Sequence, residues 1–170
     1  GINLHGSLLP KYRGAAPVQW ALLNGEAETG VSVIHMTPRL DAGPCLVQRR
    51  TEIRSDECAE ELEARLAQLG VAAVHDAIEL LQGWDGETSL GMSQGSTLAT
   101  KAPRLRKSNG EVDWTKGARS IRDQVRALKP WPGTFTTWKR ADRKELRLIL
   151  ERVSVGHGGG GDAPPGTVVS

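Results

Sequence analysis

The sequence contains little cysteine and no long apolar run. Its two cysteines among 170 residues are too few for a disulfide framework or for a four-ligand zinc site. No apolar run approaches the roughly 18 residues that a membrane-spanning helix needs, and the first residues lack the basic and apolar pattern of a signal peptide. These absences argue against a secreted disulfide scaffold and against a membrane partner, so we expect a cytoplasmic chain.

The composition is that of a globular protein, but its charge is unevenly distributed. Hydrophobic residues make up 38% and charged residues 25%, which argues against a disordered, collagen-like or coiled-coil chain. The net charge is +2, yet residues 1–100 hold 7 Lys+Arg and 13 Asp+Glu, whereas residues 101–152 hold 15 and 6. This division predicts two modules, the second facing a polyanion, although a solvated basic face would give the same counts.

The first hundred residues predict strands and helices in alternation. Apolar alternation indicates strands at residues 2–4, 29–36 and 44–53. A helix is expected over 15–24, with Pro17 tolerated in its first turn. Leucines and alanines at three- and four-residue spacing predict a longer helix over 56–82, for which Ser55 is the expected N-cap.

The second half predicts a polar connection and a small β unit. Residues 87–117 are polar, with room for one short strand, and residues 118–128 predict a helix that stops before Pro130. A glycine-rich turn is expected over 156–165. Three stretches alternate as strands, namely 134–138, 146–153 and 167–170. The domain limits that we expect are 1–98, a linker at 99–117, and a second domain that begins at 118 and continues to 170.

Asn3, His5 and Asp41 are the residues best suited to chemistry. Asn3 and His5 are two apart in a strand, so both side chains project from the same face near its carboxyl end. An amide beside an imidazole suits a reaction that builds a negative oxygen. Asp41 lies in the loop between two predicted strands, where its carboxylate would favour the imidazolium form of His5. A turn asparagine, a structural histidine and a turn aspartate would fit these positions equally well.

Several motifs add to these residues. The longest runs from Asn3 to Pro17 (NLHGSLLPKYRGAAP). Shorter ones are ETGV at 28–31, LDAGP at 40–44, ATKAPRL at 99–105, GEVDW at 110–114, KPWPG at 129–133 and PGTV at 165–168. Together they cover nearly the whole chain, and the pattern resembles the folate-dependent formyltransferases, most of all the branch that acts on methionyl initiator tRNA.

The resemblance implies an α/β fold. The chain would hold the C-terminal half of a Rossmann-like formyltransferase domain, followed by the start of a small OB-like β-barrel. It would then be a fragment that lacks the family's amino-terminal half and the end of the barrel, and that is inactive by itself.

The resemblance also implies an activity. A formyl group would pass from 10-formyltetrahydrofolate to the α-amine of methionine on initiator tRNA, with no metal or nucleotide cofactor and no protein partner. Asn3 and His5 would stabilise the oxyanion, while Asp41 would orient His5 and help to remove a proton. The segment matching the tetrahydrofolate site is Ser7, Leu8, Leu9 and Pro10.

The basic second half then has a partner, because lysine and arginine contacts to phosphates position RNA. The residues expected to face tRNA are Lys101, Arg104, Arg106, Lys107, Lys116, Arg119, Arg122 and Arg126, together with Lys11 and Arg13 beside the active loop.

Three other functions stay open. A UDP-amino-sugar formyltransferase shares almost the same first motif, and residues 1–100 do not separate it from the tRNA enzyme. A formyltetrahydrofolate hydrolase would use similar catalytic residues but has no need for a basic appended domain. A non-catalytic RNA-binding module would explain the basic half and leave Asn3, His5 and Asp41 unexplained.

Overall fold

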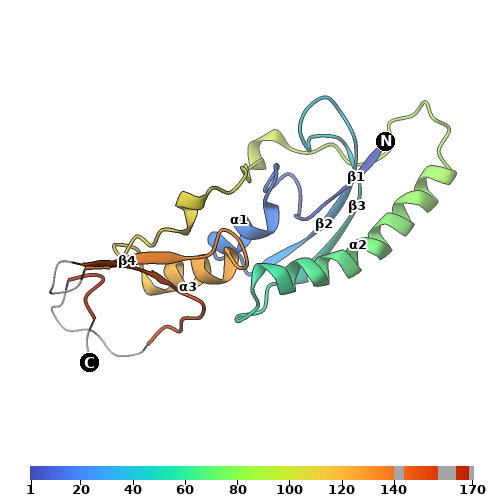
Figure 1. Cartoon of the computed structure of the whole chain (residues 1–170). Helices are drawn as coiled ribbons and strands as arrows, with labels where there is room; N and C mark the ends of the chain where they lie inside the picture. Colours follow the sequence, from blue (N-terminus) through green and yellow to red (C-terminus); the bar gives the residue numbers. More distant parts are fainter. Residues whose placement is uncertain (140–143, 157–163, 169–170) are drawn as a thin grey trace.

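A three-stranded sheet forms the centre of the first half of the chain (Figure 1). The computed structural model describes residues 1–139, 144–156 and 164–168. The strands are β1 (Ile2–His5), β2 (Glu28–His35) and β3 (Cys45–Glu52), in the order β1-β2-β3. The mixed α/β class and all three expected strands are confirmed. Residues 29–34 of β2 are buried, as suits the central strand of a sheet.

The strands of this sheet are antiparallel. Both β1 with β2 and β2 with β3 pair in this way. The reason is local, since a parallel neighbour requires a crossover that returns the chain to the same end of the sheet. Here a loop connects β2 directly to β3, so β3 must run back alongside β2.

Helix α2 (Ala59–Gln82) packs against β2 and β3. The expected apolar stripe is buried, with Leu62 and Ala73 both fully shielded from solvent. The expected N-cap is wrong, because the helix begins after Cys58, whose backbone N–H donates to the Glu61 carboxylate at 2.8 Å. Glu61 thereby satisfies the backbone N–H of Cys58 at the start of the helix. Ser55 lies three residues before Cys58 and does not cap the helix.

Helices α1 (Pro17–Leu23) and α3 (Ala118–Ala127) pack against each other and join the two halves of the chain. Leu105 and Leu128 belong to the same hydrophobic core as Leu22 and Leu62. The expected domain limits stay a prediction, but the core is continuous across residues 99–117.

The connection from α2 to α3 holds two short 3₁₀ turns, Ser96–Leu98 and Lys107–Gly110. In place of the short strand that the sequence left room for, single backbone bridges join Met92 to Cys45 and Lys101 to Arg13. The connection is therefore fastened to the sheet and to the loop after β1.

Strands β4 (Phe135–Lys139) and β5 (Glu145–Ile149) form an antiparallel hairpin at the other end of the molecule. Both match the expected strands, although β5 stops before Val153. Residues 167–168 are not in a strand, and the rest of the expected strand at 169–170 lies outside the described residues, as does most of the glycine-rich segment. Within the described ranges this end is a two-stranded sheet, and no barrel is detected.

The continuous core leads to a prediction about the free energy of unfolding. Leu128→Ala removes a side chain with 0% exposure and should lower the free energy of unfolding by about 2–5 kcal/mol. Because Leu128 shares its core with β2, amide hydrogen exchange at residues 29–34 should accelerate as well. Leu98→Ala, at a side chain with 69% exposure, is the matched control and should change stability by less than about 0.5 kcal/mol. Unchanged exchange in β2 would mean that the two halves unfold independently.

The hydrogen bonds of Glu57, just before α2, lead to a second prediction about stability. Burial alone would raise the pKa of Glu57, but hydrogen bonds from Arg65 and from the Arg54 backbone N–H outweigh burial and hold that pKa below its ordinary value. This stabilisation is therefore complete above the unfolded pKa of about 4.3 and is lost as the pH falls through the lower folded pKa. In urea unfolding, Glu57→Gln should cost more at pH 7 than at pH 3, whereas the exposed control Glu79→Gln should cost little at either pH. An equal cost at both pH values for Glu57→Gln would contradict this role.

Candidate active site

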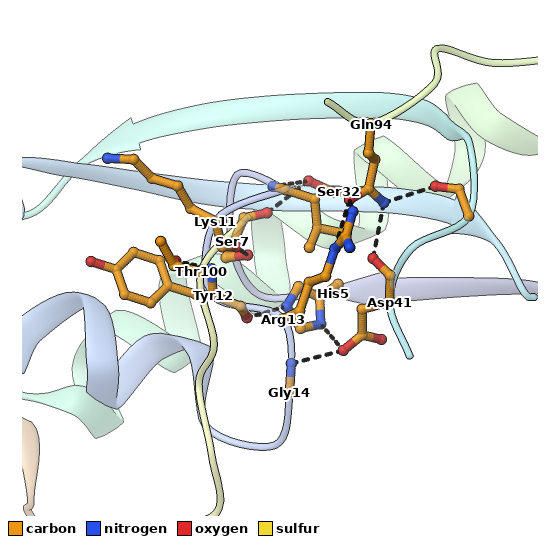
Figure 2. Close-up of polar contacts among 12 residues, drawn as sticks. His5, Ser7, Lys11, Tyr12, Arg13, Gly14, Ser32, Asp41, Gln94 and Thr100 are labelled. Carbon is orange, nitrogen blue, oxygen red and sulfur yellow. Dashed lines mark hydrogen bonds and ion pairs between the residues drawn. The ribbon is translucent and has the colours of Figure 1, made fainter. Parts of the chain in front are cut away.

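His5 lies at the end of β1 with both ring nitrogens facing acceptors. The residue is 6% exposed. Its Nε2–H donates to the backbone carbonyl of Tyr12 at 2.9 Å, and its Nδ1 lies 3.6 Å from Oδ2 of Asp41 (Figure 2). The Tyr12 carbonyl therefore fixes the orientation of the ring, with Nδ1 facing the Asp41 carboxylate.

Asp41 reaches His5 from the loop between β2 and β3. Its backbone has φ of 48°, in the left-handed region that aspartate tolerates better than most residues. The side chain is 11% exposed, and Oδ2 also accepts the backbone N–H of Gly14 at 2.9 Å. This nearly buried carboxylate thus lies beside the His5 ring and accepts one backbone N–H, so it does not lack polar partners.

Gly14 is required where it stands. Its φ is 129°, and a Cβ there would clash with the backbone carbonyl of Ala102. The missing side chain lets the loop after β1 approach residues 99–102 closely while its N–H points at Asp41.

Asn3 shares a strand with His5 but is less enclosed. It is partly buried and pairs in register with Ile34 of β2. Its side-chain amide makes no hydrogen bond within the described part of the chain, so it is available to a ligand. The structure thus brings His5 and Asp41 together and leaves Asn3 nearby on the same face of β1.

Tyr12 links the site to a second polar cluster. Its φ is 63°, a rare conformation for a residue other than glycine. Figure 2 shows its ring pointing away from His5 while its carbonyl faces His5. The hydroxyl donates to Glu26 at 2.7 Å, and the Asn24 amide donates to that hydroxyl at 3.1 Å. Burial raises the pKa of Tyr12 to about 12, so the hydroxyl remains a donor and holds the strained residue in place.

The residues expected to line the folate site, 7–10, have two different environments. Ser7 is fully buried, and its hydroxyl donates to the backbone carbonyl of Lys11 at 2.6 Å, so its side chain supports the loop. Leu8, Leu9 and Pro10 line a cavity of about 200 Å³ together with Tyr12 and other side chains. This cavity has an apolar wall that suits a flat aromatic ligand.

Gln94 and Thr100 also belong to the site, and sequence reasoning missed both. The Gln94 Nε2 donates to the carbonyls of Asp41 and Gly43, and its Oε1 accepts two hydrogen bonds from Arg13. The Thr100 hydroxyl accepts the Tyr12 N–H at 2.8 Å. Both residues lie in a polar stretch rich in glycine, serine and threonine, where no spacing marks one polar residue above another.

The residues expected to face tRNA fall into two groups. Within the described ranges, one group is exposed and has no ion-pair partner, and its members are Lys101, Arg104, Arg106, Lys107, Lys116 and Arg119. The side chains of the other group contact other residues of the chain: Lys11 pairs with Glu26, Arg13 hydrogen-bonds to Gln94, and both Arg122 and Arg126 pair with Asp123. The Arg126 side chain is only 11% exposed and also donates to two backbone carbonyls, which argues against a phosphate contact.

Residues 1–139, 144–156 and 164–168 contain neither a metal cluster nor a membrane-spanning helix. No group of three or more histidine, cysteine, aspartate or glutamate side chains there is placed to hold a metal ion. None of the helices in these ranges is both long and apolar enough to cross a membrane.

Comparisons with known proteins agree with the motifs. The family "Formyl transferase" matches residues 1–78, and "Formyl transferase, C-terminal domain" matches residues 104–170. A methionyl-tRNA formyltransferase from Rhodopirellula baltica is 52% identical over 157 residues, which cover 90% of this chain and 47% of the relative.

Solved structures under 25% identical share the fold. A 4-N formyltransferase from Francisella tularensis has a TM-score of 0.70 at 20% identity, over 91% of this chain and 63% of that one. HypX from Aquifex aeolicus, in complex with tetrahydrofolic acid, has a TM-score of 0.66 at 20% identity, over 79% of this chain and 23% of that one.

The matches cover most of this chain but only part of the length of each relative. The chain spans about half the length of the curated relatives it matches, between 47% and 52% for three of them. Both halves of the chain match formyltransferase regions in the same order, which confirms the resemblance drawn from the motifs. The chain therefore belongs to the formyl transferase family and is a homologue of the methionyl-tRNA formyltransferases over about half of their length.

Proposed function

We propose that the polypeptide carrying this chain transfers the formyl group of 10-formyltetrahydrofolate to the α-amine of methionine on initiator tRNA. The observation that carries the proposal is the His5–Asp41 pair at 3.6 Å, within a chain 52% identical to a methionyl-tRNA formyltransferase. Relatives of this name support the acceptor, and the exposed basic group between Lys101 and Arg119, which has no ion-pair partner in the described ranges, supports an RNA partner. In this proposal the protein is cytoplasmic, since initiator tRNA is its substrate.

The chemistry assigns one role to each polar group. The amine nitrogen attacks the formyl carbon, and the carbonyl oxygen becomes negative as the new C–N bond forms. Asn3 donates its free amide N–H to that oxygen. His5 turns its Nε2–H from the Tyr12 carbonyl, a neutral acceptor, to the oxyanion, which is a stronger one.

Proton transfer completes the reaction. Asp41 orients His5 and takes the proton that the amine loses. When the bond between the formyl carbon and the folate nitrogen breaks, Asp41 passes this proton to that nitrogen, so the charges balance and Asp41 is again a carboxylate. Leu8, Leu9 and Pro10 form the apolar wall for the folate ring, while Ser7 shapes the loop behind them.

The β4–β5 hairpin fits the opening of the OB-like barrel that the family resemblance implies. The exposed group at Lys101, Arg104, Arg106, Lys107, Lys116 and Arg119 would contact tRNA phosphates. We assign Arg122 and Arg126 to positions that hold α3 and the loop before α2, since Asp123 engages both.

The acceptor is tested with the whole natural polypeptide that carries these residues. Labelled formyl transfer from 10-formyltetrahydrofolate should be seen to methionyl-tRNA and not to a UDP-amino-sugar. Asn3→Ala, His5→Ala and Asp41→Asn should each lower kcat by about 100-fold or more, because each removes an oxyanion donor or its orienting partner. Leu80→Ala, on the exposed face of α2, is the control and should leave transfer unchanged. Transfer to the sugar alone would overturn the proposed acceptor, and full activity in all three variants would overturn the assigned roles.

The proposed tRNA surface leads to a separate prediction about the salt dependence of tRNA affinity. The affinity of the same polypeptide for methionyl-tRNA should fall steeply with salt. In the variant Arg104→Ala/Arg106→Ala/Lys107→Ala, the slope of log affinity against log salt should become shallower by about 1 for each phosphate that is no longer neutralised. Arg50→Gln is the control at an arginine outside this surface, because Arg50 is exposed but paired with Glu28 at 2.5 Å. A slope that the triple variant leaves unchanged would place the RNA on another surface.

A further inference from the structure

Gln94 uses all the hydrogen-bonding capacity of its amide within the candidate site. Its Nε2 donates to the backbone carbonyls of Asp41 at 2.9 Å and Gly43 at 2.8 Å. Its Oε1 accepts from Nε of Arg13 at 3.1 Å and from Nη2 at 2.6 Å. One side chain thus joins the loop that carries Asp41 to the loop that follows β1 (Figure 2).

Gln94 is directed into the site by its own segment. Residues 91–98 are all exposed except Gln94, which is half-buried. On one side of Gln94, Met92 and Cys45 exchange two backbone hydrogen bonds of 2.8 Å. On the other side, the Thr100 carbonyl accepts the Arg13 N–H at 2.9 Å. The main chain is therefore held both before and after Gln94, which fixes where the amide points.

The turn at Asp41 needs such support. Asp41 has a positive φ of 48°, and the backbone hydrogen bond that spans this turn, from Ala42 N–H to the Arg39 carbonyl, is long at 3.4 Å. The two carbonyls that receive the Gln94 amide flank Ala42 on either side. Fixing them fixes the direction of the Asp41 carboxylate, whose Oδ2 lies 3.6 Å from His5.

We propose that Gln94 is a positioning residue for formyl transfer, which holds the turn of Asp41 against His5 and orients Arg13 beside it. This inference rests on the proposed function, and it gives residues 92–102 a part in the catalytic site besides their part as a connection. Lys101 and the basic residues after it follow Gln94 closely in the sequence. A tRNA bound to these basic residues would therefore lie near Gln94, which orients Asp41.

The substitutions Gln94→Glu and Gln94→Met separate the contacts of Gln94 with Arg13 from its contacts with the Asp41 turn. Gln94→Glu keeps an acceptor for Arg13 but puts a carboxylate against the carbonyls of Asp41 and Gly43, where two donors are needed. Gln94→Met removes both sets of hydrogen bonds at nearly the same size. Gln19→Met is the matched control, since the Gln19 amide donates to Glu63 at 2.7 Å on the exposed side of α1.

The test measures formyl transfer and amide hydrogen exchange on the whole polypeptide. Both Gln94 variants should lower kcat about ten- to a hundredfold with little change in KM for methionyl-tRNA, because a displaced catalytic group slows the chemical step. Exchange at residues 39–43 should accelerate in both, and Gln19→Met should alter neither quantity. Adding Gln94→Met to Asp41→Asn should cost no further loss of kcat, whereas adding it to Lys107→Ala should give the full loss.

The outcomes separate this inference from the function on which it rests. Faster exchange at residues 39–43 with unchanged kcat, or a full further loss in the Asp41→Asn background, would overturn the positioning role while formyl transfer by the wild type stands. If the wild type does not formylate methionyl-tRNA, the proposed function fails, and unchanged exchange in Gln94→Met would then also overturn the claim that Gln94 holds the turn.

Discussion

A nearly buried carboxylate must have partners that offset its lost hydration, and Asp41 imposes this constraint on the whole first half of the chain. Its partners are the His5 ring and the Gly14 N–H, which come from the end of β1 and from the loop after it. The antiparallel pairing of β1 with β2 sets Ile2 opposite His35, so the β2–β3 loop leaves the sheet beside the start of β1. Because His5 lies at the other end of β1, opposite Ser32, the loop must fold back to bring Asp41 to the His5 ring.

The loop after β1 is held by contacts from outside the sheet. Thr100 and Ala102 hydrogen-bond to Tyr12 and Arg13, so the segment leading to α3 forms one wall of the site. The continuous core explains why this segment stays in place, since Leu105 and Leu128 anchor it beside Leu22. The candidate site, the connecting segment and α3 are therefore parts of one packed unit, and the basic residues exposed along the connection lie close to the candidate site.

Patterns of local origin were predictable from the sequence. The stripe of leucine and alanine in α2 and the strands β1, β2 and β3 followed from spacing, and the expected meeting of His5 with Asp41 followed from a strand end and a loop. The resemblance of the motifs to formyltransferases was confirmed by the family matches. Contacts that periodicity does not reveal were not predictable, and they include the pairing of β1 with β2, the N-cap at Cys58 and the hydrogen bonds of Gln94. Arg126 shows the same limit, because its charge suggested an RNA contact while Asp123 and two backbone carbonyls engage it in the fold.

The central claim is that the His5–Asp41 pair is the centre of formyl transfer. The most direct measurement is a crystal structure of the whole polypeptide with a stable analogue of 10-formyltetrahydrofolate. We expect the formyl oxygen to lie about 2.6–3.2 Å from donors on Asn3 and His5, with Asp41 still beside His5. A formyl group bound out of reach of His5, with Asp41 turned away from the ring, would contradict the claim.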